Sequence, residues 1–227
     1  LEAHDFTPVR HFFRMARPLD RPIPEPQFPP GFTLRHLAGE HEAEAWVAMF
    51  NESFIDHWNH HPMTVEEFRY ARALPHYQAE QDLIAIAPDG TFAAFCYCLI
   101  DSTENARTGR NEGWIRVLGT RRSFRRIGLG RAMLLAGLHR LKADGAETAV
   151  LGVDAANPTG ALRLYEEAGF HRIHTTSSVY PARKIEDRKE QTMFRRMEGK
   201  TPVWPYNMPA GSFRSVSLWQ NGRAASS

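Results

Sequence analysis

A segment rich in arginine and glycine, RRSFRRIGLGRAMLL at 121–135, carries the strongest chemical pattern in the sequence. It contains Arg125-x-x-Gly128-x-Gly130 and leads into leucines that share one helical face. Glycines at a helix start let backbone N–H groups approach an anion, and the helix dipole attracts phosphate. Guanidinium groups, five of which lie in this segment, pair well with phosphate oxygens. The pattern predicts a phosphate site, and it lacks the Gly-Lys-Ser/Thr ending of a P-loop.

A second pattern, NPTGALRLYEEAGF at 157–170, places a tyrosine on a short predicted helix. We expect Asn157 and Pro158 to open this helix and Gly169 to end it. Tyr165 offers a hydroxyl that is protonated at neutral pH and could protonate a departing anion. The alternative is that Tyr165 packs as a core aromatic.

Hydrophobic periodicity and turn residues predict the elements that must position these patterns. Strands are expected at 32–37, 82–87, 91–100, 113–120, 147–153 and 170–180. Helices are expected at 41–54, from Thr64, at 131–143 and at 157–168, and the polar stretch 101–111 is expected to be a loop. Pro-Asp-Gly at 88–90 predicts a hairpin between its two neighbouring strands.

The order and spacing of these patterns resemble the GNAT superfamily of acyl-CoA-dependent N-acetyltransferases over residues 32–180. The glycine segment matches the family's Arg/Gln-x-x-Gly-x-Gly/Ala motif, and residues 157–170 match its downstream Asn…Leu-Tyr…Gly-Phe motif. The resemblance implies an α/β fold: a mixed, mostly antiparallel twisted sheet, flanked by helices and splayed beside the strand before the glycine segment. It also implies acetyl transfer from acetyl-CoA to an amine of a small molecule or peptide, without a metal. The alternative is a domain that binds acyl-CoA without turnover.

The resemblance further implies a role for each residue that matches its motifs. The residues expected to hold the pantetheine arm are Leu118, Gly119, Thr120 and Asn157. Those expected to bind the diphosphate are Arg125, Arg126, Ile127, Gly128, Leu129, Gly130 and Arg131. Tyr165 would then act as the general acid that protonates the departing thiolate.

The general base is less well specified, because Trp114 stands where many members of the family carry a glutamate. Glu112 lies two residues earlier, on the same face of a strand, and could serve directly or through water. Alternatively, Glu112 is a solvated side chain at the strand end. Trp114 could instead line the acceptor pocket.

The cluster FIDHWNHHP at 54–62 lies, by resemblance, on the acceptor side. His57 and Trp58 could contact the acceptor, or they could belong to a loop in which Trp58 packs on the core. His57 and His61 have the spacing of a zinc-binding helix pair, but the motif's glutamate and a third ligand are missing. No metal site is therefore expected.

Composition excludes several functional classes. A net charge of +2 is too balanced for a surface that grips nucleic acid, and no apolar run approaches the ~18 residues of a membrane helix. The N-terminus lacks the pattern of a signal peptide, so a cytoplasmic location is expected. Cys96 and Cys98 lie on one face of a predicted strand, which favours a buried, reduced pair.

The domain organisation predicted for the chain has four parts. Residues 1–15 align without gaps on 165–179 with two identities, so we expect residues 1–16 to be the last strand of a preceding GNAT domain. Tandem GNAT proteins of the mycothiol-synthase kind have such an arrangement, and this chain resembles their C-terminal half. The strand's edge would be covered by the present sheet or by a second subunit of a homodimer. A proline-rich linker (17–31), the GNAT domain (32–184) and a partly disordered or surface-docked tail (185–227) follow.

Overall fold

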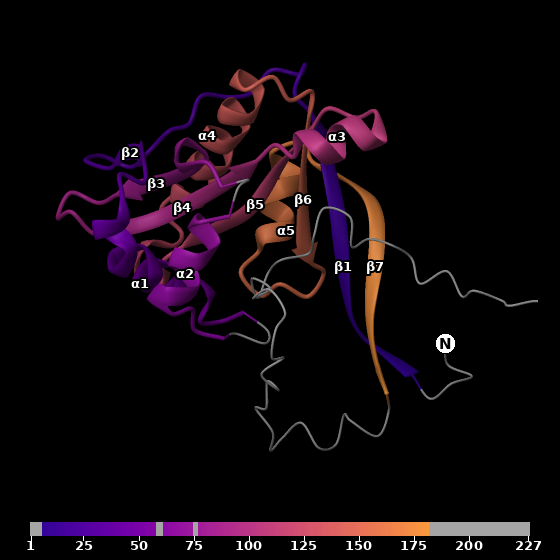
Figure 1. Cartoon of the computed structure of the whole chain (residues 1–227), viewed down its shortest axis with the longest axis horizontal. Coiled ribbons are helices and arrows are strands. Elements are labelled where there is room, and N and C mark those ends of the chain that lie inside the picture. The colour runs from indigo at the N-terminus through magenta and orange to yellow at the C-terminus, as the bar shows by residue number, and fades with distance from the viewer. Residues whose placement is uncertain (1–5, 58–60, 75–76, 182–227) are drawn as a thin grey trace, which may run out of the picture.

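A single seven-stranded sheet, in the order β2-β3-β4-β5-β6-β1-β7, runs through this computed structural model, which describes residues 6–57, 61–74 and 77–181 (Figure 1). The strands are β1 (Phe6–Pro18), β2 (Thr33–His36), β3 (Asp82–Ile86), β4 (Phe92–Leu99), β5 (Glu112–Thr120), β6 (Thr148–Asp154) and β7 (His171–Pro181). The α-helices are α1 (Ala43–Phe54), α2 (Val65–Arg72), α3 (Ser102–Thr108), α4 (Leu129–Ala143) and α5 (Ala161–Glu167). All neighbouring strands are antiparallel except β5 and β6, which confirms the mixed, mostly antiparallel sheet.

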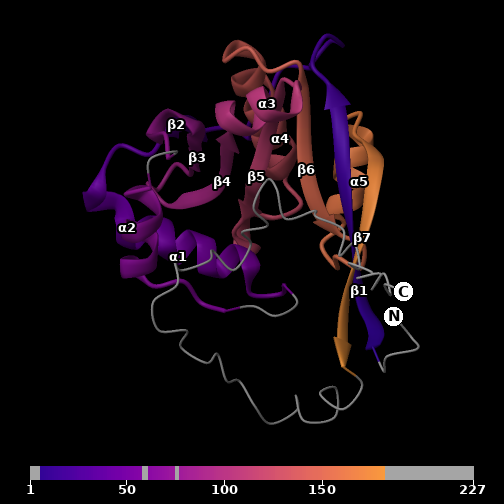
Figure 2. The ribbon, with the colours of Figure 1, turned by 45° about the vertical axis from the view of Figure 1, so that its right-hand side comes forward.

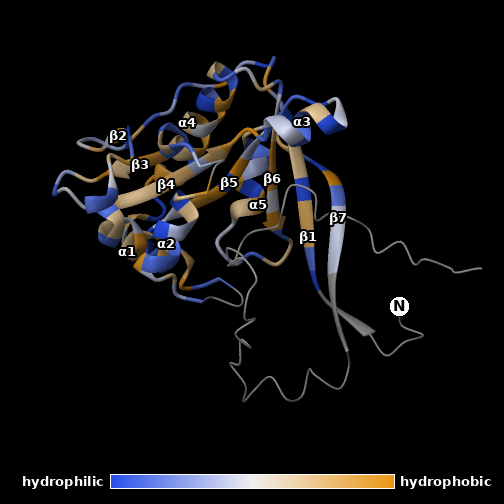
Figure 3. Cartoon of the chain, in the orientation of Figure 1, coloured by the Kyte–Doolittle hydropathy of each residue, from blue (hydrophilic) through white to orange (hydrophobic). Residues whose placement is uncertain are grey.

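Helices cover both faces of the sheet, α1 and α2 on one and α4 and α5 on the other (Figures 1 and 2). On the first face, Trp46 stacks on Phe68 with ring centroids 4.5 Å apart. On the second, α4 lies against β4 at Gly137, where an added Cβ would be 2.6 Å from the Cys96 sulfur. The hydrophobic residues are accordingly concentrated in the central strands and α4 (Figure 3).

The two cysteines form the buried, reduced pair that the sequence predicts. Cys96 and Cys98 are both free and buried beneath α4, with sulfur atoms 3.9 Å apart. The hydrogen bond with Cys96, together with burial, raises the pKa of the Cys98 thiol. The pair therefore acts as small apolar packing.

The N-terminal strand β1 lies between β6 and β7 and is antiparallel to both (Figure 2). This confirms that the segment pairs with the present sheet, although the strand continues to Pro18 instead of ending at residue 16. The chain from residue 19 to residue 32 forms no helix or strand, as expected, but Leu19 is 1% exposed and so belongs to the core. The origin of β1 in a preceding domain stays a prediction, and residues 1–5 and 182–227 lie outside the described residues.

Arg17 fastens β1 to the end of α5. Its guanidinium is buried and donates to the carbonyl oxygens of Ala168 (2.8 Å), Pro18 (3.1 Å) and Pro22 (2.8 Å). Gly169, with φ +89°, brings the chain so close that a Cβ would lie 3.3 Å from Arg17 Nε. The guanidinium thereby satisfies a carbonyl at the C-terminus of α5.

We predict that Arg17→Met lowers the free energy of unfolding by about 2 kcal/mol, because it removes charge-assisted bonds to buried carbonyl oxygens while keeping the apolar stem. Urea unfolding followed by circular dichroism measures this change. Arg163→Met, at an exposed position of α5, is the control and should change the midpoint little. Equal midpoints for the two variants would contradict the assignment.

Two local predictions were wrong. Residues 101–111 contain helix α3, because Asp101 Oδ1 accepts from the Glu104 N–H and caps it. Helix α5 begins at Ala161 instead of near Asn157, whose Oδ1 accepts from the Thr159 N–H (2.8 Å) and closes a turn. In both places the side-chain oxygen of an Asp or Asn accepts from a nearby backbone N–H. This bond stabilises a helix start at Asp101 and a turn at Asn157, in place of the predicted loop and helix start.

Candidate functional site

The glycine segment forms the start of α4. Gly128 is the N-cap residue, with φ +86°, and Arg126 also adopts a left-handed conformation with φ +66°. Among the described residues, no side chain caps this helix, so the first-turn N–H groups before Ala132 have neither a helical nor a side-chain acceptor. Such an uncapped N-terminus on a 15-residue helix fits a phosphate or diphosphate ligand.

The arginines of this segment divide into two groups. Arg125 donates to Asp56 Oδ2 (2.6 Å) and to the carbonyl oxygen of Ser53 (2.8 Å), and Arg121 pairs with Glu52. These two fasten the segment to the C-terminal end of α1, and the Arg125 hydrogen bond holds the pKa of Asp56 below its ordinary value. The exposed arginines around the start of α4 are Arg122, Arg126 and Arg131, and Arg122 also lies 3.7 Å from Asp56 Oδ1. Sequence reasoning missed Asp56, because its partner lies 69 residues away.

Strands β5 and β6 pair only at their N-terminal ends, where the last partners are Ile115 and Leu151. Both strands continue beyond this point, so they part toward Thr120 and the start of α4 (Figure 1). Residues 118–120 pair with β4 on one side, and no described strand pairs with them on the other. This is the splayed sheet that the resemblance implies, and it leaves backbone groups of Leu118, Gly119 and Thr120 facing the gap.

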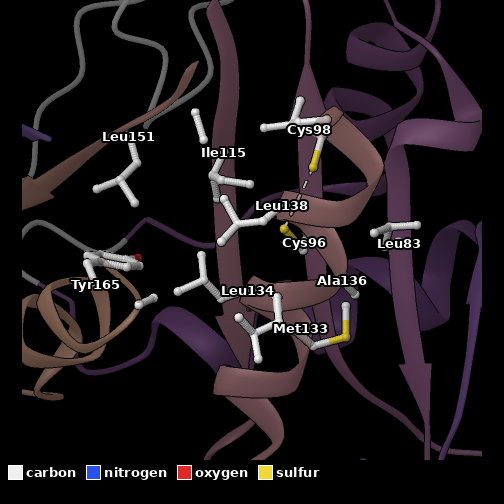
Figure 4. Close-up of a cluster of buried hydrophobic side chains, with 14 of the residues drawn as sticks. Leu83, Cys96, Cys98, Ile115, Met133, Leu134, Ala136, Leu138, Leu151 and Tyr165 are labelled. Carbon is white, nitrogen blue, oxygen red and sulfur yellow. Dashed lines mark hydrogen bonds between the residues drawn. The ribbon is translucent and has the colours of Figure 1, made fainter. Parts of the chain in front are cut away.

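Tyr165 lies over the closed end of this gap, on the α4 side of the sheet. Its ring belongs to the same core cluster as Leu134, Ile115 and Leu151 (Figure 4). The side chain is 8% exposed, and burial raises the pKa of the Tyr165 hydroxyl above its ordinary value. The tyrosine is therefore a packed aromatic whose hydroxyl stays protonated at neutral pH.

Glu112 and Trp114 lie at the paired end of β5, away from the glycine segment. The Glu112 carboxylate accepts from Arg14 Nη2 at 2.5 Å and lies 3.5 Å from Arg110 Nη1. The Trp114 ring is buried on the face opposite α4, with the Arg14 guanidinium carbon 4.8 Å from its centroid. Glu112 thus ties β5 to β1, and a role as base remains a prediction.

The remaining predicted site residues are not all brought together. His57 follows α1, and its ring meets Phe54 edge-on at 5.8 Å. Trp58 lies outside the described residues. Within residues 6–57, 61–74 and 77–181, no three His, Cys, Asp or Glu side chains are placed to hold a metal. In the same part of the chain, no helix has the length and apolar character to cross a membrane.

The model of the GNAT acetyltransferase family matches residues 43–170, which include α4, the β5–β6 gap and Tyr165. The chain belongs to this family. Among solved structures, a GCN5-related N-acetyltransferase from Sphaerobacter thermophilus is 29% identical, with a TM-score of 0.65. That match covers 78% of this chain and 52% of the other. The NatC complex, solved with Gag peptide and CoA, is 18% identical with a TM-score of 0.50, a likeness that shows the fold alone.

Curated relatives of this GNAT chain include mycothiol acetyltransferases. The one from Thermobispora bispora is 35% identical over 166 residues, and the one from Salinispora tropica is 34% identical over 170 residues. The matches cover 73% and 74% of this chain, and 55% and 54% of the relatives. The chain therefore spans about half the length of the curated relatives that it matches.

Proposed function

We propose that this chain transfers an acetyl group from acetyl-CoA to a primary amine of a small molecule or peptide by direct attack. One observation carries the proposal: an uncapped helix start, a gap between β5 and β6, and a buried tyrosine lie in succession along β5. The gap from Ile115 to Thr120 spans about 16 Å of strand, at about 3.3 Å per residue. It would hold an extended arm whose diphosphate end lies at α4 and whose thioester end lies near Tyr165.

The donor site would be built from backbone groups. The N–H groups at 126–131 would hold the diphosphate, and Leu118, Gly119 and Thr120 would hold the pantetheine arm. Asn157, on the turn after β6, would contact the arm. Arg125 would act by fastening the loop, since its guanidinium is already bonded to Asp56 and to Ser53 O.

Tyr165 and Glu112 would each carry one of the two proton transfers that the reaction needs. Acetyl-CoA would supply the thioester, and Tyr165 would give its proton to the departing thiolate. The amine must lose a proton, and Glu112 would accept it through water, with Arg14 holding the carboxylate in place. The amine could approach past Trp114 and His57, and alignment of amine and thioester would supply much of the rate.

The test is a coenzyme A release assay with acetyl-CoA across amino acids, polyamines, aminoglycosides, peptides and amine precursors of thiol cofactors. Release above the amine-free rate in one class, with the acetylated amine found by mass spectrometry, supports the proposal. Calorimetric binding of acetyl-CoA without release on any amine would contradict it and would indicate the binding-only alternative.

We predict that Arg131→Glu weakens acetyl-CoA binding by roughly 30-fold, because reversing this exposed charge costs about 2 kcal/mol beside a diphosphate. A glutamate in the first turn favours the helix, so the melting temperature should stay the same or rise. Isothermal titration calorimetry and thermal unfolding measure the two effects. Arg131→Gln is the matched control, with a smaller loss of affinity, and unchanged affinity in Arg131→Glu would exclude this helix start as the diphosphate site.

A further inference from the structure

Strands β1 and β7 lie side by side at one end of the sheet (Figure 2), and their sequences are also related. The gapless alignment of 1–15 on 165–179, continued to the end of β1, carries Phe6–Pro18 onto residues 170–182. Strand β7 spans His171–Pro181, so the alignment and the structure agree on both strand ends to within one residue. The two strands can therefore be compared residue by residue.

The register of this strand pair contains a two-fold axis that follows the alignment. Phe12 faces Thr176, and Thr176 is also the residue that the alignment places on Phe12. One residue away, His11 faces Ser177, which is the equivalent of Phe13 on the opposite side of the axis. Every antiparallel pair has local two-fold axes, but an alignment of unrelated strands has no reason to coincide with one of them.

The two β-bulges of the pair obey the same axis. On β1 the extra residue is Val9, and on β7 it is Ile173. The alignment places Val9 on Ile173. A bulge is a local feature that antiparallel pairing does not require, and bulges are usually retained within a family of related folds. Bulges at equivalent positions therefore favour the view that β1 and β7 are the same strand of two related units.

Strand β1 has a second neighbour, whereas β7 has none in the part of the chain that the structure describes. The other edge of β1 pairs with β6 over Phe12–Pro18. The axis that carries β1 onto β7 also carries β6 onto the outer edge of β7, along residues 176–181. Residues His171–Thr175 of β7 are exposed, and an uncovered strand edge is a template for pairing with another strand.

The backbone groups on this outer edge point in a defined direction. The carbonyl oxygen of His11 accepts from the Ala155 N–H on the β6 side of β1, at 2.9 Å. Backbone groups alternate along a strand, so Phe12 directs its own groups toward β7, where it pairs with Thr176. By the same alternation, Ser177 directs its N–H and C=O away from β1. Ser177 is thus placed to bond an added strand.

We propose that the outer edge of β7 binds the strand equivalent to β6 in a second GNAT unit, the unit whose last strand is β1. The two units exchange their last strands and share one continuous sheet, with β1 and β7 at its centre. The curated relatives have nearly as many residues outside the matched segment as inside it, which leaves room for such a unit. This interface is independent of the proposed acetyl transfer.

A second copy of this chain fits the same edge less well. A copy placed by the two-fold axis would bring its own β7 to the position between β6 and β7 that β1 already fills. Such a copy could pair only β7 with β7, and the equivalent of β6 would then have no edge to join. The position of β1 in the sheet therefore favours a unit that ends in β1.

The experiment measures hydrogen exchange of single amides by NMR on two proteins. One is residues 1–227, and the other is the polypeptide that the gene encodes, with any residues that precede Leu1. In residues 1–227, we expect the outward amides of Ser177 and Val179 to exchange roughly 100-fold faster than the inward amide of Thr176. In the encoded polypeptide, we expect a GNAT unit before Leu1 and slow exchange at all three amides.

Two variants at one position sharpen the test. Ser177→Pro removes an outward N–H, a change that a free strand edge tolerates, so the circular dichroism of residues 1–227 should be unchanged. In the encoded polypeptide, the same variant should speed exchange at Val179 by roughly tenfold, because the ladder to the second unit loses a bond. Ser177→Ala, the matched control, loses the hydroxyl that lies 2.8 Å from His11 Nδ1 but keeps the N–H, so exchange at Val179 should stay slow.

The other outcomes overturn the proposal. A polypeptide without a GNAT unit before Leu1, or equally fast exchange at Ser177 in both proteins, would exclude the named partner. Slow exchange in residues 1–227 that depends on protein concentration would indicate a second copy on the edge, and slow exchange at every concentration would indicate another segment of the same chain. The assay needs no substrate, so none of these results bears on acetyl transfer.

Discussion

Replacement of Tyr165 by Phe is expected to lower kcat for acetyl transfer by about 10²- to 10³-fold, the range of a lost general acid. The change removes one oxygen from a ring packed among Leu134, Ile115 and Leu151, so the packing is kept. Acetyl-CoA affinity should change less than threefold, because the hydroxyl acts on the thiolate that forms only during the reaction. Steady-state kinetics and calorimetry on the two proteins measure both quantities.

The control for this variant is Tyr70→Phe, which alters a 39%-exposed tyrosine on α2 and should leave kcat unchanged. Burial raises the pKa of Tyr165, so the acid should remain protonated beyond the ordinary tyrosine value of about 10. Equal turnover by Tyr165→Phe and wild type, on an acceptor that is acetylated, would remove the tyrosine from the mechanism.

A loss of stability from pH 5 to pH 8 is expected in the wild type, with Asp82 as its main source. This carboxyl is 1% exposed and accepts from Trp46 Nε1 (3.2 Å) and the Tyr77 hydroxyl (3.1 Å). Burial raises its pKa to about 7. Between about pH 4 and this value, the folded state keeps a proton that the unfolded state releases, so the free energy of unfolding falls as pH rises.

The full difference in pKa corresponds to about 4 kcal/mol, which is an upper bound for a buried group. Asp82→Asn stays neutral at every pH and should remove most of this slope, so its stability relative to wild type should increase toward pH 8. Urea unfolding at pH 5, 6.5 and 8 measures the slope, and Asp20→Asn, an exposed change, should keep it. A wild-type slope in Asp82→Asn would show that other groups cause it.

The local patterns of the sequence were sufficient to predict most helices and strands and the helix start at the glycine segment. The glycine segment at the start of α4 and the turn at Gly169 depend on residues close in the chain. Helical spacing and strand alternation are equally local, so they indicate α1, α4 and the central strands directly. The wrong predictions at Asp101 and Asn157 also have local causes. At each position a hydrogen bond from a nearby backbone N–H to the side chain outweighs the propensity on which the prediction was based.

The sequence by itself therefore determined that the chain has a GNAT-type core, a glycine-rich start of α4 and a tyrosine on the following helix. Only the tertiary structure decided how the charged groups are paired and where they lie. Arg125 turned out to be bonded to Asp56, 69 residues away, and Glu112 to Arg14, 98 residues away. The structure also placed Arg116 in a bulge where β5 leaves β6. The physical reason is that an ion pair or a strand register joins residues distant in the chain, and no local pattern specifies the partner.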